Sequence, residues 1–194
     1  MKRPAIALVL TLACGALGAA CATPYAHGRS AFLRGDYVEA ASRFEEALAD
    51  RPARLDALVG LGISRYKFGA WAEAKDALGR VVMRAPKHLE ARLYLGLASL
   101  RSGDIAGAEE HLTEFRDLRQ DPRITAQTDR ALRLLRGDPL PEEMIQFVAA
   151  SLEDEATLVR ELDAARAAAR ADPSPLYRRA VYCTPARHGR LICF

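Results

Sequence analysis

Small and apolar residues recur along this chain at a fixed interval of 34 positions. Each interval holds two runs of helical length, with a glycine between them and, in the first two intervals, a proline near the end. Five landmarks keep this step: Gly28, Gly62 and Gly96; Gly35, Gly69 and Gly103; Ala40, Ala74 and Ala108; Tyr37, Trp71 and Ile105; Pro52 and Pro86. Three unrelated helix pairs would not share them in one register, so the pattern predicts an internal repeat and a solenoid.

The residue types of the landmarks fit packed pairs of helices. A glycine such as Gly62 at a crossing lets the neighbouring helix approach closely, and we expect a small residue such as Ala74 to face it. Gly35, Gly69 and Gly103 fall in the turns, where a residue after a helix often needs a positive φ. One helix pair cannot bury its apolar face, so three pairs are expected to stack and to need caps.

The pattern changes after the third interval. An amphipathic helix is predicted over residues 124–136, in the register of a degenerate fourth repeat. Pro141 opens a further helical stretch that ends near Ala171, either as one long helix or as two halves broken near Ser151. In the tail, residues 176–183 and 190–194 predict a short β-hairpin around a loop at 184–189.

The first twenty residues form a secretory signal. A basic start, Lys2 and Arg3, precedes an apolar stretch and a region of small residues. Without those two cations the chain carries 26 basic and 25 acidic residues, so its net charge falls from +3 to about +1. This balance does not argue for nucleic acid or an anionic membrane as the partner.

Leu17-Gly18-Ala19-Ala20-Cys21 resembles a bacterial lipobox, in which the cysteine becomes the first mature residue and receives the lipid. The resemblance implies lipidation of Cys21, although Gly18 stands where leucine is preferred. Cys14 is a second candidate, and ordinary signal cleavage or an uncleaved anchor are alternatives. Cys183 and Cys193 then remain as an even pair in an oxidising compartment, so we predict that they form a disulfide.

Three blocks of the chain resemble the tetratricopeptide repeat (TPR) family: 21–54, 55–88 and 89–122. The family usually has Leu, Gly and Tyr at positions 7, 8 and 11 of each unit. The blocks give His27, Gly28 and Ala31; Leu61, Gly62 and Arg65; and Leu95, Gly96 and Ser99. The missing aromatics at position 11 are departures, with Phe32 and Tyr66 one residue later. The resemblance implies an all-α solenoid of helix-turn-helix repeats, with capping helices over 123–171 and a tail over 172–194.

In this family, first-helix positions 2, 5, 9 and 12 line the inner face of the superhelix. Here they include Tyr25, Arg29 and Asp56. They also include six apolar residues, which form the candidate partner-binding groove: Val59, Ile63, Tyr66, Leu93, Leu97 and Leu100. Two interpretations stay open. The groove takes an apolar or helical segment of a partner, or the chain fills it with its own helix after Pro141.

No pattern of catalytic chemistry is visible in the sequence. Adjacent carboxylates such as Glu45 and Glu46 point apart on a helix, and Cys183, His188 and Cys193 supply three ligands where a structural zinc site needs four. We expect no enzyme activity, cofactor or metal. The sequence predicts a scaffold lipoprotein that binds an envelope protein at the periplasmic face of the outer membrane. The alternative is a secreted periplasmic subunit whose repeats mediate homo-oligomerisation.

Overall fold

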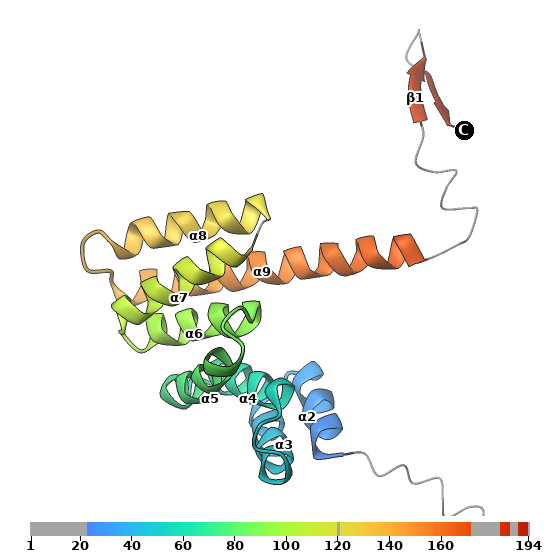
Figure 1. Cartoon of the computed structure of the whole chain (residues 1–194). Coiled ribbons are helices and arrows are strands. Elements are labelled where there is room, and N and C mark those ends of the chain that lie inside the picture. The colour runs from blue at the N-terminus through green and yellow to red at the C-terminus, as the bar shows by residue number, and fades with distance from the viewer. Residues whose placement is uncertain (1–22, 120, 172–182, 187–189, 194) are drawn as a thin grey trace, which may run out of the picture. The chain divides into compact units, whose positions relative to one another are not determined.

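The computed structural model describes residues 23–119, 121–171, 183–186 and 190–193. These residues form two compact units that divide between Leu118 and Arg119, and each unit is described by itself. The first unit consists of consecutive helix pairs (Figure 1). Its helices are α2 (Pro24–Leu33), α3 (Tyr37–Asp50), α4 (Leu55–Lys67), α5 (Trp71–Arg84), α6 (Leu89–Arg101) and α7 (Ile105–Leu118).

Each helix packs on the next one along the chain, and α4 also packs on both α2 and α6. Contacts between first helices of successive pairs are what a stack of repeats requires. The predicted all-α solenoid is therefore confirmed.

The turn inside each pair has the same hydrogen-bonded cap. In the first pair, Gly35 N–H donates to the Phe32 carbonyl at 3.0 Å and Asp36 N–H donates to the Ala31 carbonyl at 3.0 Å. These two hydrogen bonds together form the Schellman motif, which needs a residue with positive φ at the glycine position. Gly35, Gly69 and Gly103 have φ values of 80°, 91° and 78°, so the turn role predicted for these glycines is confirmed.

The crossing glycines permit close approach, but the residue that meets each glycine differs from the expectation. A Cβ built on Gly62 would lie 2.5 Å from Leu78 Cγ, and one on Gly96 would lie 2.8 Å from Leu112 Cγ. In the first pair the same position, Gly28, meets the ring of Phe44 at 2.9 Å. Large side chains one helical turn beyond the predicted alanines therefore fill the space that each glycine leaves.

An arginine replaces the family's aromatic residue in the second pair and joins three helices. Arg65 on α4 donates from Nη2 to Glu45 Oε1 on α3 at 2.7 Å and from Nη1 to the Glu73 carbonyl on α5 at 3.2 Å. The next junction has its own ion pair, since Lys75 Nζ on α5 lies 2.6 Å from Asp104 Oδ2 before α7. Polar contacts thus supplement apolar packing between successive pairs.

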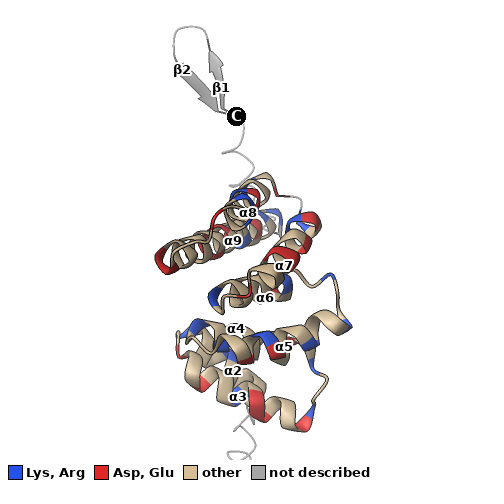
Figure 2. Cartoon of the chain, turned by 90° about the vertical axis from the view of Figure 1, so that its left-hand side faces the viewer, with Lys and Arg blue, Asp and Glu red and all other residues tan. Residues whose placement is uncertain are grey.

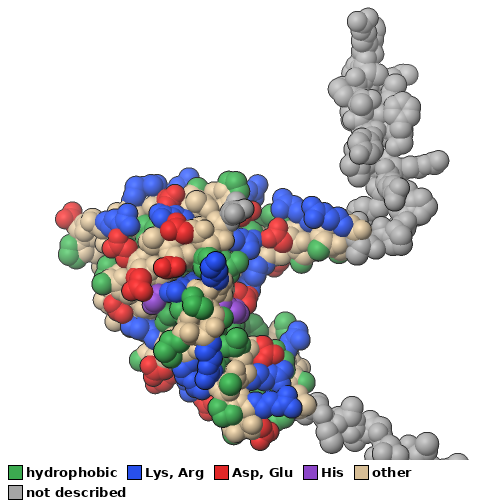
Figure 3. Space-filling model, viewed as in Figure 1, with side chains coloured by type: hydrophobic (Ala, Val, Ile, Leu, Met, Phe, Trp, Pro, Cys, Tyr) green, Lys and Arg blue, Asp and Glu red, His purple; other side chains and the backbone are tan. Residues whose placement is uncertain are grey.

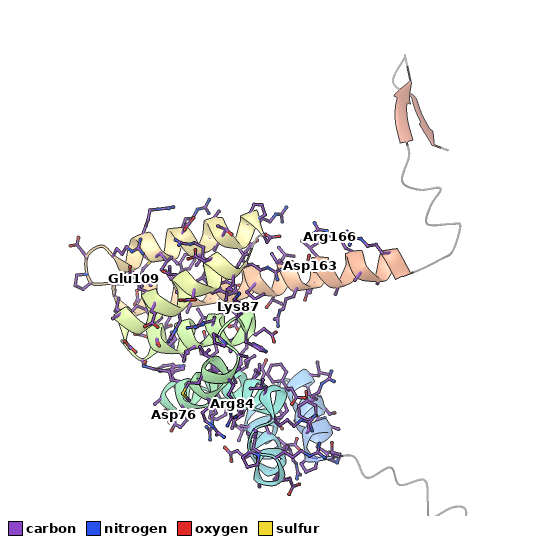
Figure 4. The ribbon with its side chains drawn as sticks, in the orientation of Figure 1. Asp76, Arg84, Lys87, Glu109, Asp163 and Arg166 are labelled. Atoms are coloured by element: carbon purple, nitrogen blue, oxygen red, sulfur yellow. The ribbon has the colours of Figure 1, made fainter. Side chains whose placement is uncertain are left out.

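The second unit contains α8 (Pro122–Leu135) and α9 (Glu142–Ala171), which pack on each other. Helix α9 is a single helix of 30 residues with no break at Ser151, which decides between the two interpretations left open by the sequence. At 1.5 Å per residue it is about 45 Å long, roughly twice the length of α8. Its second half is therefore largely exposed and carries local ion pairs such as Asp163 with Arg166, at 3.3 Å (Figure 4).

The tail contains strands β1 (Cys183–Ala186) and β2 (Arg190–Cys193), which pair antiparallel with Cys183 directly opposite Cys193. The sequence placed residues 184–186 in the loop. The structure instead places them in β1, and three residues are left between the strands. Pro185 is tolerated because a strand of a two-stranded sheet has an unpaired edge. The disulfide between the two cysteines stays a prediction.

Within the part of the chain that the structure describes, no helix is both long enough and apolar enough to cross a bilayer.

Candidate functional site

The six residues of the candidate groove are all buried. They lie on α4 and α6, the first helices of the second and third pairs, which contact each other. Tyr66 packs against Tyr94 of α6 with ring centroids 5.3 Å apart and planes at 69°. The exposed fractions are 7% for Val59, 5% for Ile63, 9% for Tyr66, 4% for Leu93 and 0% for both Leu97 and Leu100. A partner segment therefore cannot reach these side chains without rearrangement, and their binding role stays a prediction.

An accessible part of the inner face lies where the first and second repeats meet, and it is polar and aromatic. Arg54, just before α4, makes a two-point ion pair with Asp56, with Nε to Oδ1 at 2.7 Å and Nη2 to Oδ2 at 3.0 Å. The guanidinium carbon of Arg54 lies 3.7 Å from the centre of the Tyr25 ring, which also packs on Phe44. Three helices, α2, α3 and α4, and Arg54 before α4 thus hold one cluster of planar side chains.

Electrostatics couple the members of this cluster. The hydrogen bond from Arg54 lowers the pKa of the Asp56 carboxyl, against the opposing effect of its partial burial. Burial raises the pKa of the Tyr25 hydroxyl, and its hydrogen bond to Asp56 raises it further. The Arg54 and Asp56 charges are therefore already matched to each other. Arg29, one turn after Tyr25 on α2, is an exposed cation close enough to influence Tyr25.

Sequence reasoning placed Tyr25, Arg29 and Asp56 on the inner face but assigned the site to the apolar residues beside them. It missed Arg54, because this residue is the last of its 34-residue block and lies outside the first-helix positions of the family pattern. The available signal was the spacing of Arg54 and Asp56, which lets an arginine before a helix pair with an acid in its first turn. Along the helices, acidic and basic residues are interspersed (Figure 2).

A second feature that the sequence did not indicate is a buried arginine beside a histidine. Arg92 on α6 is 9% exposed, and it donates from Nε to the Pro86 carbonyl at 2.9 Å. Its Nη1 lies 3.1 Å from Nδ1 of His111 on α7. Because arginine only donates, Nδ1 of His111 must accept, so the imidazole is neutral with its proton on Nε2. Burial lowers the pKa of His111, and Arg92 lowers it further, while Glu110 and Asp104 oppose this.

This pair predicts that the fold loses stability in mild acid. The unfolded chain protonates His111 near its ordinary pKa of about 6.5, whereas the folded chain resists the proton to lower pH. Unfolding therefore becomes more favourable as the pH falls below about 6.5. The measurement is the midpoint of thermal unfolding at about pH 7.5 and about pH 5.5, which lie above and below that ordinary pKa. His111→Gln should weaken the dependence, and exposed His27→Gln should leave it unchanged; equal slopes in both variants would contradict this assignment.

The remaining predicted sites lie where the structure gives no side chains. Cys21 falls outside the described residues, and for Cys183 and Cys193 only the backbone pairing is described. Lipidation of Cys21 and the disulfide stay predictions. Among the described residues, no three His, Cys, Asp or Glu side chains gather in a group that could hold a metal ion.

Comparisons with known proteins identify the repeat. Two family models, each described as a tetratricopeptide repeat, match residues 31–88 and 60–122. A curated protein, the CTR9 homolog of Arabidopsis thaliana, is 34% identical over 77 residues. That match covers 39% of this chain and only 7% of the length of the relative.

Solved structures show the same fold at low sequence identity. The Arabidopsis OM64 TPR domain has a TM-score of 0.54 and 15% identity, over 60% of this chain and 93% of that one. The Sgt2 TPR domain from Aspergillus fumigatus has a TM-score of 0.51 and 23% identity, over 61% and 83%. The Yersinia enterocolitica chaperone SycD, in complex with a peptide of the translocator YopD, has a TM-score of 0.50 and 18% identity, over 64% and 90%.

These likenesses fall on the residues that carry the 34-residue step. The three Schellman turns and the helices from α3 to α7 lie within residues 31–122, the region that the two family models match together, while Gly28 and most of α2 precede it. Residues 31–122 of the chain therefore carry tetratricopeptide repeats.

Proposed function

We propose that this chain is a non-catalytic scaffold lipoprotein of a bacterial cell envelope, anchored through Cys21 at the periplasmic face of the outer membrane. Its repeats hold another envelope protein. The chain's TPR repeats support the coarser part of this proposal, a scaffold for protein–protein interaction. The signal sequence and lipobox support the finer part.

The observation that carries the binding role is the accessible inner face where the first and second repeats meet. There, Tyr25 and the Arg54–Asp56 pair form a preorganised platform, and Arg29 adds an exposed cation beside it. Preorganised aromatic and arginine side chains are the residue types that anchor protein interfaces. A partner with an acidic residue next to an apolar or aromatic one matches this platform. The partner therefore contacts this platform first, and it reaches the buried groove residues of α4 and α6 only afterwards.

Cross-linking in intact cells, followed by purification of the chain from membranes and mass spectrometry, tests the proposal. We expect one envelope protein to be enriched, and Arg29→Glu to reduce its capture about tenfold, which corresponds to about 1.4 kcal/mol. The matched control is Arg84→Glu. Arg84 is equally an exposed arginine, but it lies in the last turn of α5, a second helix of a repeat (Figure 4). Equal loss in both variants, or in neither, counts against a site at the first repeat.

Treating cells with globomycin tests the lipid anchor independently of the binding role. Lipidation at Cys21 predicts that unprocessed precursor accumulates in treated cells, and unchanged processing would mean that the cysteine is not lipidated. The second candidate, a secreted periplasmic subunit whose repeats mediate homo-oligomerisation, predicts instead a cross-linked product at a multiple of the chain's own mass.

A further inference from the structure

Large apolar side chains are exposed along one edge of the repeat unit. Leu33 at the end of α2 is 78% exposed, Val38 at the start of α3 is 65% exposed, and Phe68 after α4 is 43% exposed. All three flank the glycine turns inside the first two repeats. We call Leu33, Val38, Phe68 and Trp71 the turn edge. Another exposed apolar residue of this unit, Met83, lies near the opposite end of α5.

Cations and aromatic rings alternate at the same edge. The Lys67 ammonium lies 5.8 Å from the centre of the Tyr37 ring. The guanidinium carbon of Arg101 lies 4.5 Å from the centre of the Trp71 ring. Because Lys67 comes from the second repeat and Tyr37 from the first, this contact also places the two turns side by side. In the view of Figure 3, hydrophobic and basic side chains lie next to each other on the surface of this unit.

The acidic groups near the turn edge are engaged locally. Asp36 accepts a hydrogen bond from the Glu39 N–H at 3.1 Å and caps α3. The Glu39 carboxylate pairs with Arg34 at 3.0 Å. Glu73 lies in the first turn of α5, where the helix dipole stabilises a negative charge. Of these acidic groups, Glu39 is matched by a cation, and the Arg34–Glu39 pair reduces the repulsion that an anionic surface would meet at this edge.

We propose that the turn edge rests on the phospholipid surface to which the chain is anchored. Exposed aliphatic residues together with Trp, Tyr, Lys and Arg are the composition of a protein surface that sits at the boundary between headgroups and acyl chains. The inference rests on the proposed lipidation of Cys21.

The position of the anchor selects a bilayer over other occupants. Cys21 precedes Thr23, the N-cap of α2, by two residues, and two extended residues span at most about 7 Å. Helix α2 is itself only about 15 Å long. A lipidated Cys21 therefore keeps Leu33, the turn-edge residue at the far end of α2, within about 25 Å of the membrane at all times, a high effective concentration that no untethered protein shares.

The single tryptophan of the chain provides the probe, because Trp71 belongs to the turn edge. Full-length mature protein, purified with its lipid, is reconstituted into phosphatidylethanolamine and phosphatidylglycerol vesicles that contain brominated acyl chains. The inference predicts that bromine quenches Trp71 emission. Leu33→Glu with Val38→Glu should abolish the quenching, since it places two charges in the contact. Met83→Glu, about 18 Å away along α5, should leave it intact.

Vesicle flotation of the same samples measures membrane binding through the lipid anchor, independently of Trp71 quenching. We expect all three proteins to float with the vesicles. Trp71 should be quenched in the wild-type and Met83→Glu proteins and not in the double variant. Flotation without quenching, or quenching that survives in the double variant, overturns the inference and leaves the proposed lipoprotein standing. Failure of the wild-type protein to float overturns the anchor and the inference together.

Discussion

Replacing Leu97 with glutamate is expected to destabilise the fold by at least about 3 kcal/mol. Leu97 is 0% exposed, so the substitution removes a fully buried apolar side chain and places a carboxylate where water cannot reach it. Domains of this size are stable by only about 5 to 15 kcal/mol, so the loss is a large share of the total. Urea unfolding followed by circular dichroism measures it as a lower midpoint.

Leu33→Glu is the matched control, since it makes the same exchange at a leucine that is 78% exposed, and we expect a change within about 0.5 kcal/mol. The pair also bears on the candidate groove. If Leu97 were an open contact for a partner, Leu97→Glu would block binding and leave stability unchanged. Burial of both Leu93 and Leu97 makes loss of folding the expected result for the double glutamate variant as well.

Replacing Gly62 with alanine is expected to cost about 1 to 3 kcal/mol, although alanine is the better helix former. The new Cβ would lie 2.5 Å from Leu78 Cγ and 2.7 Å from its Cδ2. Leu78 is itself 0% exposed and cannot move away without disturbing its own packing. The two helices must therefore separate, or the leucine must leave its rotamer.

Gly79 gives the opposite expectation from the same exchange. It is also inside a helix, α5, but a Cβ built there meets nothing within 4 Å. Gly79→Ala should stabilise the fold by about 0.5 to 1 kcal/mol, because only the helix propensity changes. Chemical unfolding of the two variants side by side separates packing from propensity. A stabilised Gly62→Ala protein would contradict the close crossing of α4 and α5.

Arg65, which is partly exposed, and the buried Arg92 show why a repeat tolerates departures from its family pattern. Arg65 occupies the position of a family aromatic, yet it joins α3, α4 and α5 through a carboxylate and a carbonyl. Arg92 likewise satisfies a carbonyl and a histidine in a mostly buried place. Each arginine brings donors in a planar fork and a long apolar stem, so it fills space and supplies polar contacts together.

The sequence by itself determined the repeat, its length and its turns. A strict 34-residue step and glycines that need positive φ are local properties, and the structure places Gly35, Gly69 and Gly103 in three equivalent caps. The register also identified which residues belong to first helices, and so which could line the inner face.

Only the tertiary structure decided which of those inner-face residues are accessible. Val59 and Leu97 share the helix positions of Tyr25 and Arg29 in the repeat pattern, yet the first two are buried, whereas Tyr25 is only partly buried and Arg29 is exposed. The tertiary structure also decided that Phe44, Leu78 and Leu112 meet the crossing glycines, and that Arg54 stacks on Tyr25. Burial depends on residues far away in the chain, and a periodic sequence specifies only the neighbours within each repeat.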